Sequence, residues 1–278
     1  MNIDAHQHFW VYDPVEYPWM TEEKAALRRD YLPEDLAREQ AKVQFDGSIA
    51  VQARQTLEES RWLLELADRN ERIKGVVGWV DLCSGRVAEQ LEKFAAHQKF
   101  VGVRHVVQDE PDDRFMLRPE FLRGLGVLNQ FNLTYDLLVY PRQLPAAIEI
   151  VQRFPEQPFV LDHMAKPPIK GGILSPWKEQ IQELAAFPNV SCKVSGIVTE
   201  ADWREWKSED FTPYLDVVSE AFREDRLMVG SDWPVCLLAA SYDQAVNLAQ
   251  DYFQDASKEA RRKIFGANAR KIYGACGS

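Results

Sequence analysis

The sequence predicts a single (β/α)8 barrel, an α/β fold in which eight parallel strands close into a ring inside a layer of helices. The chain has 278 residues, a little more than the roughly 250 typical of this fold. Short β-branched runs recur from one end to the other, and each is followed by a longer stretch with helical periodicity. No linker or low-complexity tract interrupts this alternation, so we expect one TIM-barrel domain over residues 1–278.

Eight segments have the character of strands. We expect them at residues 2–8, 48–54, 74–82, 101–107, 134–139, 159–165, 190–196 and 227–232. Strands that alternate with helices form a parallel sheet, and eight of them close most economically into a barrel.

Amphipathic segments separate these strands and follow the last one. Helical periodicity is clearest at residues 57–70, 86–97, 119–130, 144–154, 176–187, 211–223, 242–252 and 257–273. Two connections are long for this fold: residues 10–32, which carry Trp19, and the region after the seventh strand, with Trp203 and Trp206. Long loops on the carboxyl-terminal face of such barrels build substrate pockets.

The composition favours a small-molecule partner. A net charge of −10 disfavours binding to nucleic acid or to an anionic membrane. The four cysteines lack Cys-x-x-Cys spacing, which argues against a disulfide framework or a thiolate zinc site. No segment is apolar enough to span a bilayer, and the first residues do not resemble a secretion signal, so we expect a cytoplasmic protein. No pattern specifies an oligomeric state.

Two histidines stand at spacing two near the end of the first expected strand. Because side chains of a strand alternate between two faces, His6 and His8 should face the barrel interior together. An isolated histidine is more often structural. Two converging imidazoles, however, are costly to bury without a metal, a carboxylate or a substrate, so the pair indicates a site.

The eighth strand supplies a carboxylate beside that pair. It reads Leu-Met-Val-Gly-Ser-Asp over residues 227–232. Barrel closure sets the eighth strand next to the first, so we expect Asp232 close to His6 and His8. A turn or capping role for Asp232 is the alternative.

The sixth strand adds a third imidazole. His163 lies at its carboxyl end, and Asp162 should point to the opposite face if the strand is regular. The alternative for His163 is a hydrogen bond within the loop layer.

Further polar side chains share the interior register. They are Gln52, Arg54, Arg104, Asp136, Lys193 and Ser195. A buried arginine needs an anionic or carbonyl partner. For Arg104 that partner is either a substrate or an internal carboxylate such as Asp81 or Asp136, whereas His105 should face the helices.

Taken in order, these residues resemble the amidohydrolase superfamily (amidohydrolase 2 type), in particular its sugar-lactonase branch, which includes L-fuconolactonase and L-rhamnonolactonase. The matching stretches cover essentially the whole chain. They are Asp-Ala-His-Gln-His-Phe-Trp at 4–10, Gly-Val-Arg-His at 102–105, Leu-Asp-His-Met-Ala-Lys-Pro at 161–167, Cys-Lys-Val-Ser-Gly at 192–196 and Val-Gly-Ser-Asp-Trp-Pro at 229–234.

The resemblance implies hydrolysis of a sugar lactone to the aldonic acid at the carboxyl-terminal mouth of the barrel. Asp232 would act as general base on water and His163 would orient the water or the carbonyl. His6, His8 and Asp232 would hold a divalent ion where one is present.

The resemblance also implies residues that contact the substrate. Arg104 and Lys193 would stabilise the developing oxyanion, and Trp19 would cover the sugar face. Gln52 and His105 complete the expected substrate-binding set.

The expected metal content rests on a departure from the superfamily pattern. Members with two metals carry a bridging Lys or Glu and two further histidines, whereas this chain offers His163 and the less well oriented His105. We therefore expect at most one ion, with zinc favoured over manganese by the histidine-rich set. Lactones are reactive enough that some relatives work without a metal, which leaves the need for one open.

Three rival functions share these motifs. A metal-dependent decarboxylase of the same superfamily would use the same His pair and Asp232, and a dicarboxylate lactonase would add cations that face a carboxylate. A non-catalytic sugar-binding barrel would tolerate replacement of the histidines and of Asp232 without loss of its activity.

Overall fold

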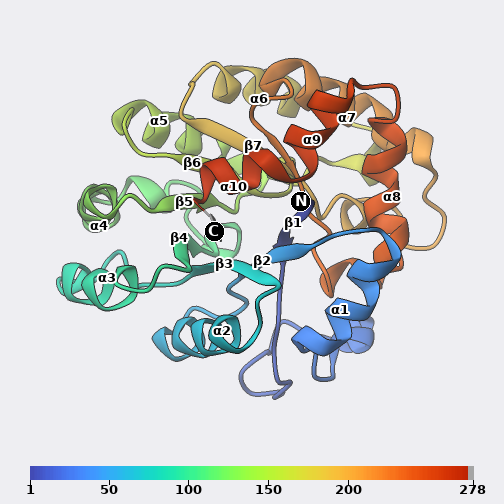
Figure 1. The fold of residues 1–278 in the computed structure, drawn as a ribbon. Coiled ribbons are helices and arrows are strands. Elements are labelled where there is room, and N and C mark those ends of the chain that lie inside the picture. Colours follow the sequence, from blue (N-terminus) through green and yellow to red (C-terminus); the bar gives the residue numbers. More distant parts are fainter. Residues whose placement is uncertain (275–278) are drawn as a thin grey trace.

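Eight parallel strands in chain order form the centre of the computed structural model, which describes residues 1–274 (Figure 1). The strands are β1 (Ile3–Gln7), β2 (Gly47–Val51), β3 (Ile73–Gly78), β4 (Phe100–His105), β5 (Thr134–Leu137), β6 (Phe159–Leu161), β7 (Val190–Val194) and β8 (Leu227–Val229). The ring closes beyond β8, where the Asp232 amide donates to the carbonyl of His6 at 2.8 Å and the His8 amide donates to the carbonyl of Trp233 at 2.7 Å. The predicted (β/α)8 barrel is confirmed.

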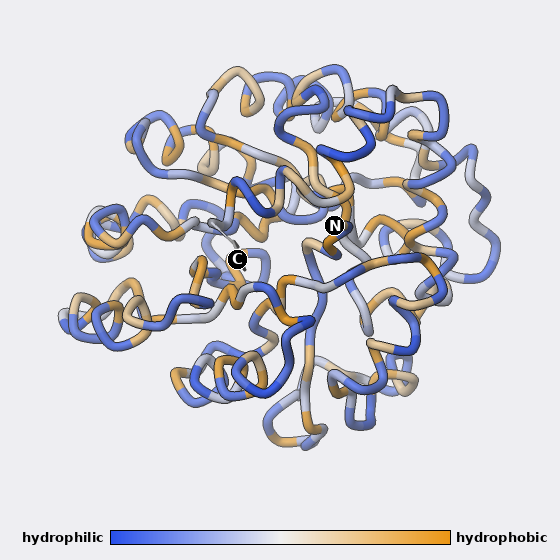
Figure 2. The backbone as a smooth tube through the Cα atoms, in the orientation of Figure 1, coloured by the Kyte–Doolittle hydropathy of each residue, from blue (hydrophilic) through white to orange (hydrophobic). Residues whose placement is uncertain are grey.

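Helices surround the strands as an outer layer. They are α1 (Pro33–Lys42), α2 (Leu57–Arg69), α3 (Val87–Ala95), α4 (Pro119–Leu128), α5 (Leu144–Arg153), α6 (Trp177–Ala185), α7 (Ser208–Phe222), α8 (Tyr242–Tyr252), α9 (Lys258–Arg262) and α10 (Asn268–Ile272). Along each longer helix hydrophilic and hydrophobic residues alternate, as expected when one face packs on the barrel (Figure 2).

Local capping signals explain where the first two helices begin. The Thr56 hydroxyl accepts a hydrogen bond from the Glu59 amide at 3.1 Å and so starts α2. The helix α1 was not among the expected segments. It begins with a proline in its first turn, and the Asp35 carboxylate accepts from the Leu32 amide at 3.2 Å.

Apolar side chains fill the barrel interior and close it at the amino ends of its strands. They include Ile3, Ala5, Ile49, Val51, Val77, Val101, Val160 and Met228, and Ala269 and Tyr273 join them from the chain's last helical segment. Gly266 passes so close to β1 that an added Cβ would lie 2.2 Å from the carbonyl oxygen of Met1. This end of the barrel is therefore plugged, and a substrate can enter only from the carboxyl-terminal end.

Two compositional expectations bear on the described residues. Cys83, Cys192 and Cys236 carry free thiols, whereas Cys276 lies outside the described residues. Within residues 1–274, no helix has both the length and the apolar character needed to cross a membrane.

Candidate active site

A cavity of about 660 Å³ opens at the carboxyl-terminal end of the barrel. Its innermost residues come from four strand ends, and its walls come from the loops that follow β1, β2, β4, β5, β6 and β8. The polar residues at its base are His8, Arg104, His163 and Asp232. The wall residues include Trp10, Glu16, Trp19, Arg54, Gln108, Glu110, Tyr140 and Lys166.

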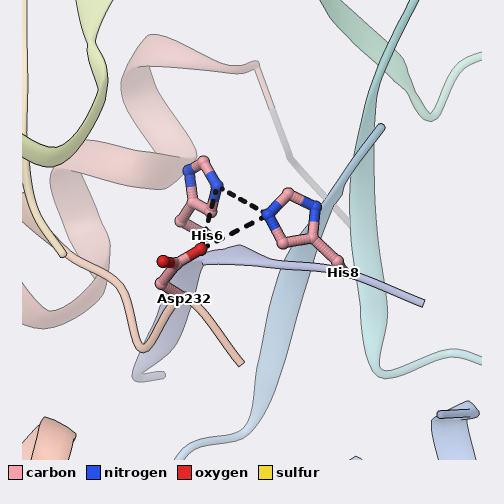
Figure 3. A group of neighbouring side chains, drawn as sticks. All are labelled: His6, His8 and Asp232. Carbon is pink, nitrogen blue, oxygen red and sulfur yellow. Dashed lines mark hydrogen bonds and ion pairs between the residues drawn. The ribbon is translucent and has the colours of Figure 1, made fainter. Parts of the chain in front are cut away.

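His6, His8 and Asp232 converge (Figure 3), and of the three His8 and Asp232 line the base of this cavity. The Nε2 atoms of His6 and His8 lie 3.2 Å apart. Oδ1 of Asp232 lies 3.3 Å from Nε2 of His8 and 3.7 Å from Nε2 of His6. All three side chains are almost completely buried. The expected proximity of strand eight to the histidine pair is confirmed.

The backbone around these residues is adapted to bring them together. The pairing of β1 with β2 shifts register between Asp4 and Gln7, next to His6. At Gly230 an added Cβ would lie 2.7 Å from Cβ of His6, so only glycine permits this approach of β8 to β1. Asp232 itself has a φ of +58°, a conformation that a non-glycine residue adopts at a cost.

A buried carboxylate clamps the two strands beside the site. Oδ1 of Asp4 accepts from the Ser231 amide at 2.9 Å and from the His6 amide at 3.2 Å, and Oδ2 accepts from the Ser231 hydroxyl at 2.6 Å. The hydroxyl of Tyr242 on α8 donates to the same Oδ2 at 3.1 Å. These bonds fix the peptide that precedes Asp232.

The chain leaves β6 through a left-handed segment. His163, Met164, Ala165 and Lys166 all have positive φ angles between 51° and 58°. His163 thereby turns into the cavity, and its Nδ1 lies 2.8 Å from the hydroxyl of Ser195. An added Cβ at Gly196, whose φ is +62°, would lie 2.5 Å from that Nδ1, so glycine is required here too.

The expectation that Asp162 faces away from the interior is wrong. β6 ends at Leu161, and the irregular turn after it brings both Asp162 and His163 into the barrel. Oδ2 of Asp162 accepts from Nη1 of Arg104 at 3.1 Å, and Oδ1 lies 2.9 Å from Nζ of Lys193. The alternation rule failed because it assumes a regular strand.

Arg104 lies against the histidine pair. Its Nη2 donates to Oε1 of Gln52 at 3.1 Å, and its Nη1 lies 3.3 Å from Nε2 of His6. Its carboxylate partner is Asp162, not Asp81 or Asp136. The guanidinium also lines the cavity, so the internal pairing and a contact with substrate are compatible.

Burial and mutual contact shift the pKa values of His6, His163 and Asp232. Burial lowers the pKa of His163 to about 4, despite the carboxylates of Asp232 and Asp162. Burial likewise lowers the pKa of His6 well below its ordinary value. Burial opposes ionisation of Asp232, but the neighbouring histidines, His163 foremost, outweigh it and hold the pKa of Asp232 below its ordinary value. At neutral pH the site therefore contains an ionised Asp232 carboxylate beside neutral His6 and neutral His163.

The residues predicted to bind substrate do not all line the cavity. Trp19 lines the cavity, with its ring 6.1 Å from that of Trp10. Gln52 and Lys193 are fully buried and lie outside the cavity lining. His105 faces the helix layer, as expected of its strand position. There it stacks on Phe115, and its Nε2 lies 2.7 Å from Glu110.

Lys166 is a cavity residue to which the sequence reasoning assigned no role. Its Nζ lies 3.1 Å from Oε1 of Glu200 and 5.6 Å from the centre of the Tyr140 ring. Burial opposes its charge, but Glu200 and Asp232 outweigh this and raise its pKa. The sequence signal was its place in the 161–167 stretch, three residues after His163, but only the left-handed turn brings both side chains to one cavity.

The donor set of His6, His8 and Asp232 fits a divalent metal ion. Tetrahedral ligands about 2.0–2.1 Å from zinc lie about 3.3 Å from one another, and the three donor atoms here are 3.2–3.7 Å apart. Nδ1 of His8 lies 2.8 Å from the carbonyl of Val51, an arrangement that leaves the lone pair on Nε2. Nη1 of Arg104 brings a permanent positive charge against the same donors, which weakens their affinity for a dication.

The chain is similar to known proteins over nearly its whole length. The chain is 41% identical to an L-fucono-1,5-lactonase of Burkholderia multivorans, over 98% of this chain and 96% of that protein. It is 37% identical to an L-fucono-1,5-lactonase of Burkholderia ambifaria, over 98% and 95% of the two chains.

A solved structure extends the likeness to three dimensions. The crystal structure of a Burkholderia multivorans amidohydrolase with bound Zn superimposes with a TM-score of 0.95 at 41% identity, and covers 99% of each chain. The sequence profile of the amidohydrolase family matches residues 3–275. With His6 on β1 and His8 just after it, a third histidine after β6 and an aspartate after β8, the chain belongs to the amidohydrolase family.

Proposed function

We propose that this protein hydrolyses a sugar lactone to the corresponding aldonic acid. The observation that carries the proposal is the ionised Asp232 carboxylate, held by imidazoles at the base of a cavity large enough for a monosaccharide lactone. The similarity to L-fucono-1,5-lactonases over nearly the whole chain supports the same class of reaction and makes L-fucono-1,5-lactone the first substrate to test.

Asp232 is the base in this mechanism. Its carboxylate takes a proton from water as the water oxygen bonds to the lactone carbonyl carbon. Neutral His163, whose Nδ1 is held by Ser195, presents Nε2 towards Asp232 at 3.8 Å and so can orient that water. The tetrahedral intermediate collapses with cleavage of the ring C–O bond, and the ring oxygen leaves as a hydroxyl after it takes up the proton.

The developing oxyanion needs positive charge at the cavity surface. Arg104 and Lys166 both line the cavity, and each is neutralised in the resting protein by one carboxylate, Asp162 and Glu200. They can stabilise the oxyanion without reorganisation. Lys193 is enclosed beneath the site, so we propose that it acts on the protein's own groups and not on substrate.

A single divalent ion fits the proposal as an optional component. His6, His8 and Asp232 would hold it, and zinc suits this set better than manganese. When bound, the ion would supply a Lewis acid near the carbonyl. The adjacent guanidinium of Arg104 predicts weak binding.

The charges in the cavity favour a neutral substrate over an anionic one. Its lining contains Lys24, Arg54, Arg104 and Lys166, but also Glu16, Asp109, Glu110 and Asp232. Arg54 pairs with Glu16 across the mouth of the cavity. A decarboxylase or a dicarboxylate lactonase would need cations free to face a carboxylate, and this balance argues against both.

The test uses a pH indicator, with and without a chelator, to follow acid release from a panel of aldonolactones of both ring sizes and proton uptake with several aromatic acids. We expect rapid hydrolysis of at least one sugar lactone and no decarboxylation of the aromatic acids. If no lactone is hydrolysed, either with or without added zinc, the proposal is contradicted. A cytoplasmic location remains a prediction that cell fractionation can check.

A further inference from the structure

His105 faces away from the cavity but contacts a residue of its wall. Its Nε2 lies 2.7 Å from Oε1 of Glu110, which lines the cavity from the turn that follows β4. His105 is buried, whereas the Glu110 side chain is 23% exposed. The pair therefore connects the helix layer to the cavity in which we expect the substrate to bind.

A second contact fixes which nitrogen of His105 carries the proton. The indole N–H of Trp79 donates to Nδ1 of His105 at 3.3 Å, and an indole nitrogen can only donate. Nδ1 is therefore unprotonated. Burial lowers the pKa of His105 below its ordinary value, so the ring is neutral at neutral pH and its one proton is on Nε2. That proton is donated to Glu110.

The groups around His105 hold this donor in place. The imidazole stacks on Phe115, with the ring centres 4.9 Å apart. The backbone of Trp79 is bonded twice to the hydroxyl of Ser60 on α2, which accepts from its amide and donates to its carbonyl, both at 2.8 Å. Oε1 of Glu110 therefore accepts from a donor whose position and tautomer are both fixed.

The turn that carries Glu110 is also tied to its neighbours. The Glu110 amide donates to the carbonyl of Val107 at 3.0 Å, and the same carbonyl accepts from the side chain of Gln143 at 2.8 Å. Oε1 of Gln55 accepts from the Val106 amide at 2.8 Å. These bonds join the turn to the loops that follow β2 and β5, so Glu110 is preorganised for a ligand.

The second oxygen of Glu110 is available to a ligand. Within residues 1–274, His105 is the one basic side chain that pairs with this carboxylate, and its ring is neutral. In the same part of the chain Oε2 has no hydrogen-bond partner. A carboxylate accepts hydrogen bonds and cannot donate them. Oε2 therefore suits a hydroxyl group and repels an anion.

We propose that Glu110 is a specificity-determining residue that accepts a hydrogen bond from one ring hydroxyl of the lactone through Oε2. His105 is a positioning residue that holds Oε1 and so presents Oε2 to the cavity. This inference rests on the proposed lactonase function and extends it, because it makes the substrate a polyhydroxylated, uncharged lactone. A hydrogen bond to an ionised acceptor is about twice as strong as a neutral one, which suits discrimination between hydroxyl stereoisomers.

The test measures the binding of aldonolactams by calorimetry. A lactam keeps the hydroxyls of the lactone, but a ring N–H replaces the ring oxygen and makes it resistant to hydrolysis. Monodeoxy lactams each lack one hydroxyl, and loss of one particular hydroxyl should weaken binding to the wild type about tenfold. Where a lactone is hydrolysed, the KM values of its monodeoxy forms give the same comparison.

Glu110→Met keeps the length of the side chain and removes the acceptor. The full lactam should bind to this variant about tenfold more weakly than to the wild type, and loss of the same hydroxyl should then change the affinity by less than about twofold. Asp68→Met is the matched control. Asp68 also pairs with Nε2 of a histidine, His97 at 3.0 Å, but it lies outside the cavity lining. Its affinities should match those of the wild type.

His105→Phe tests the positioning role. Phenylalanine keeps an aromatic ring on Phe115 but donates no proton to Glu110. The penalty for the missing hydroxyl should shrink from about tenfold to about threefold, while kcat for a hydrolysed lactone stays within about twofold of the wild type. A merely structural role for His105 would not change the selectivity between full and deoxy ligands.

The readouts separate the two proposals. If the wild type binds lactams but hydrolyses no lactone, the proposed function fails, and the hydroxyl comparison still tests Glu110. If it neither binds a lactam nor hydrolyses a lactone, both proposals fail. An equal loss of affinity for full and deoxy ligands in Glu110→Met overturns the inference, as does a wild type in which no hydroxyl matters. Should Glu110→Met not fold, an undiminished hydroxyl penalty in His105→Phe overturns it.

Discussion

Nε2 of His8 lies 3.3 Å from Oδ1 of Asp232, and the opposite nitrogen of the same ring is held by the carbonyl of Val51 at 2.8 Å. The ring therefore cannot rotate without breaking a buried hydrogen bond. Because the backbone of His6 and His8 also exchanges hydrogen bonds with Asp232 and Trp233, the spacing of the Asp232 carboxylate and the His8 imidazole is built into the closure of the barrel.

Asp232→Asn should reduce kcat for lactone hydrolysis by at least about a hundredfold, within the range that general bases contribute. The amide keeps the size of the side chain but cannot take a proton from water, so KM should change little. Steady-state kinetics measure both. Asp225→Asn is the control, since Asp225 is exposed and pairs with Lys263 far from the cavity. Wild-type turnover by Asp232→Asn would refute the base assignment.

His8→Asn should remove most of the zinc affinity, because it deletes one of three converging donors. Calorimetric titration of chelator-treated protein measures the loss, which we expect to exceed tenfold. His97→Asn is the matched control, since His97 lies at the surface beside Asp68. Equal affinities for the two variants would place the zinc elsewhere.

Trp19→Ala should raise KM about tenfold and leave kcat within about threefold. The indole forms part of the cavity wall and packs edge-to-face on Trp10, so it offers a flat apolar surface to a sugar ring. Trp19→Phe should restore most of the affinity because it keeps an aromatic face. A fall in kcat at constant KM would instead indicate that Trp19 positions the reacting groups.

Glu59→Gln should make the protein more stable at alkaline pH and leave its stability near pH 4 unchanged. The buried carboxylate of Glu59 accepts from the amides of Ala53 and Arg54 at 3.0 and 2.8 Å. Burial raises its pKa from 4.5 to about 7. The folded state thus binds this proton more tightly than the unfolded state, and that stability is present below about pH 4.5 and lost as the pH rises through about 7.

The loss amounts to at most about 3 kcal/mol at pH 8. Glutamine keeps an oxygen for the two amides and carries no charge, so the difference between variant and wild type isolates the ionisation of Glu59. Denaturant unfolding at pH 4, 6 and 8 measures it. A difference that does not grow with pH would show that the carboxylate ionises at its ordinary pKa.

The barrel was predictable because its strands and helices repeat along the chain. The proximity of His6, His8 and Asp232 was predictable because the barrel has to close. Eight apolar runs fix the number of strands, and closure alone sets Asp232 beside His6 and His8. The orientation of His105 towards the helices was also predictable from alternation along β4, since that strand is regular up to His105.

Alternation could not predict the path of the chain after β6. Asp162 was assigned to the wrong face, and Lys166 was given no role, because four successive residues adopt left-handed angles that no residue type there signals. Lys193 was expected to contact substrate. Its interior position was correct, but the sequence does not reveal that Asp136 and Asp162 enclose its ammonium.

The left-handed segment after β6 has a consequence for engineering this barrel by loop exchange. Five consecutive residues, from Asp162 to Lys166, deliver an anion to the barrel interior, an imidazole to the base of the cavity and a cation to the cavity wall. Insertion or deletion of a single residue here would misplace all three at once. The connection over residues 10–32 supplies wall residues such as Trp19 but none of the central groups, so altered selectivity should be sought there, with 162–166 left intact.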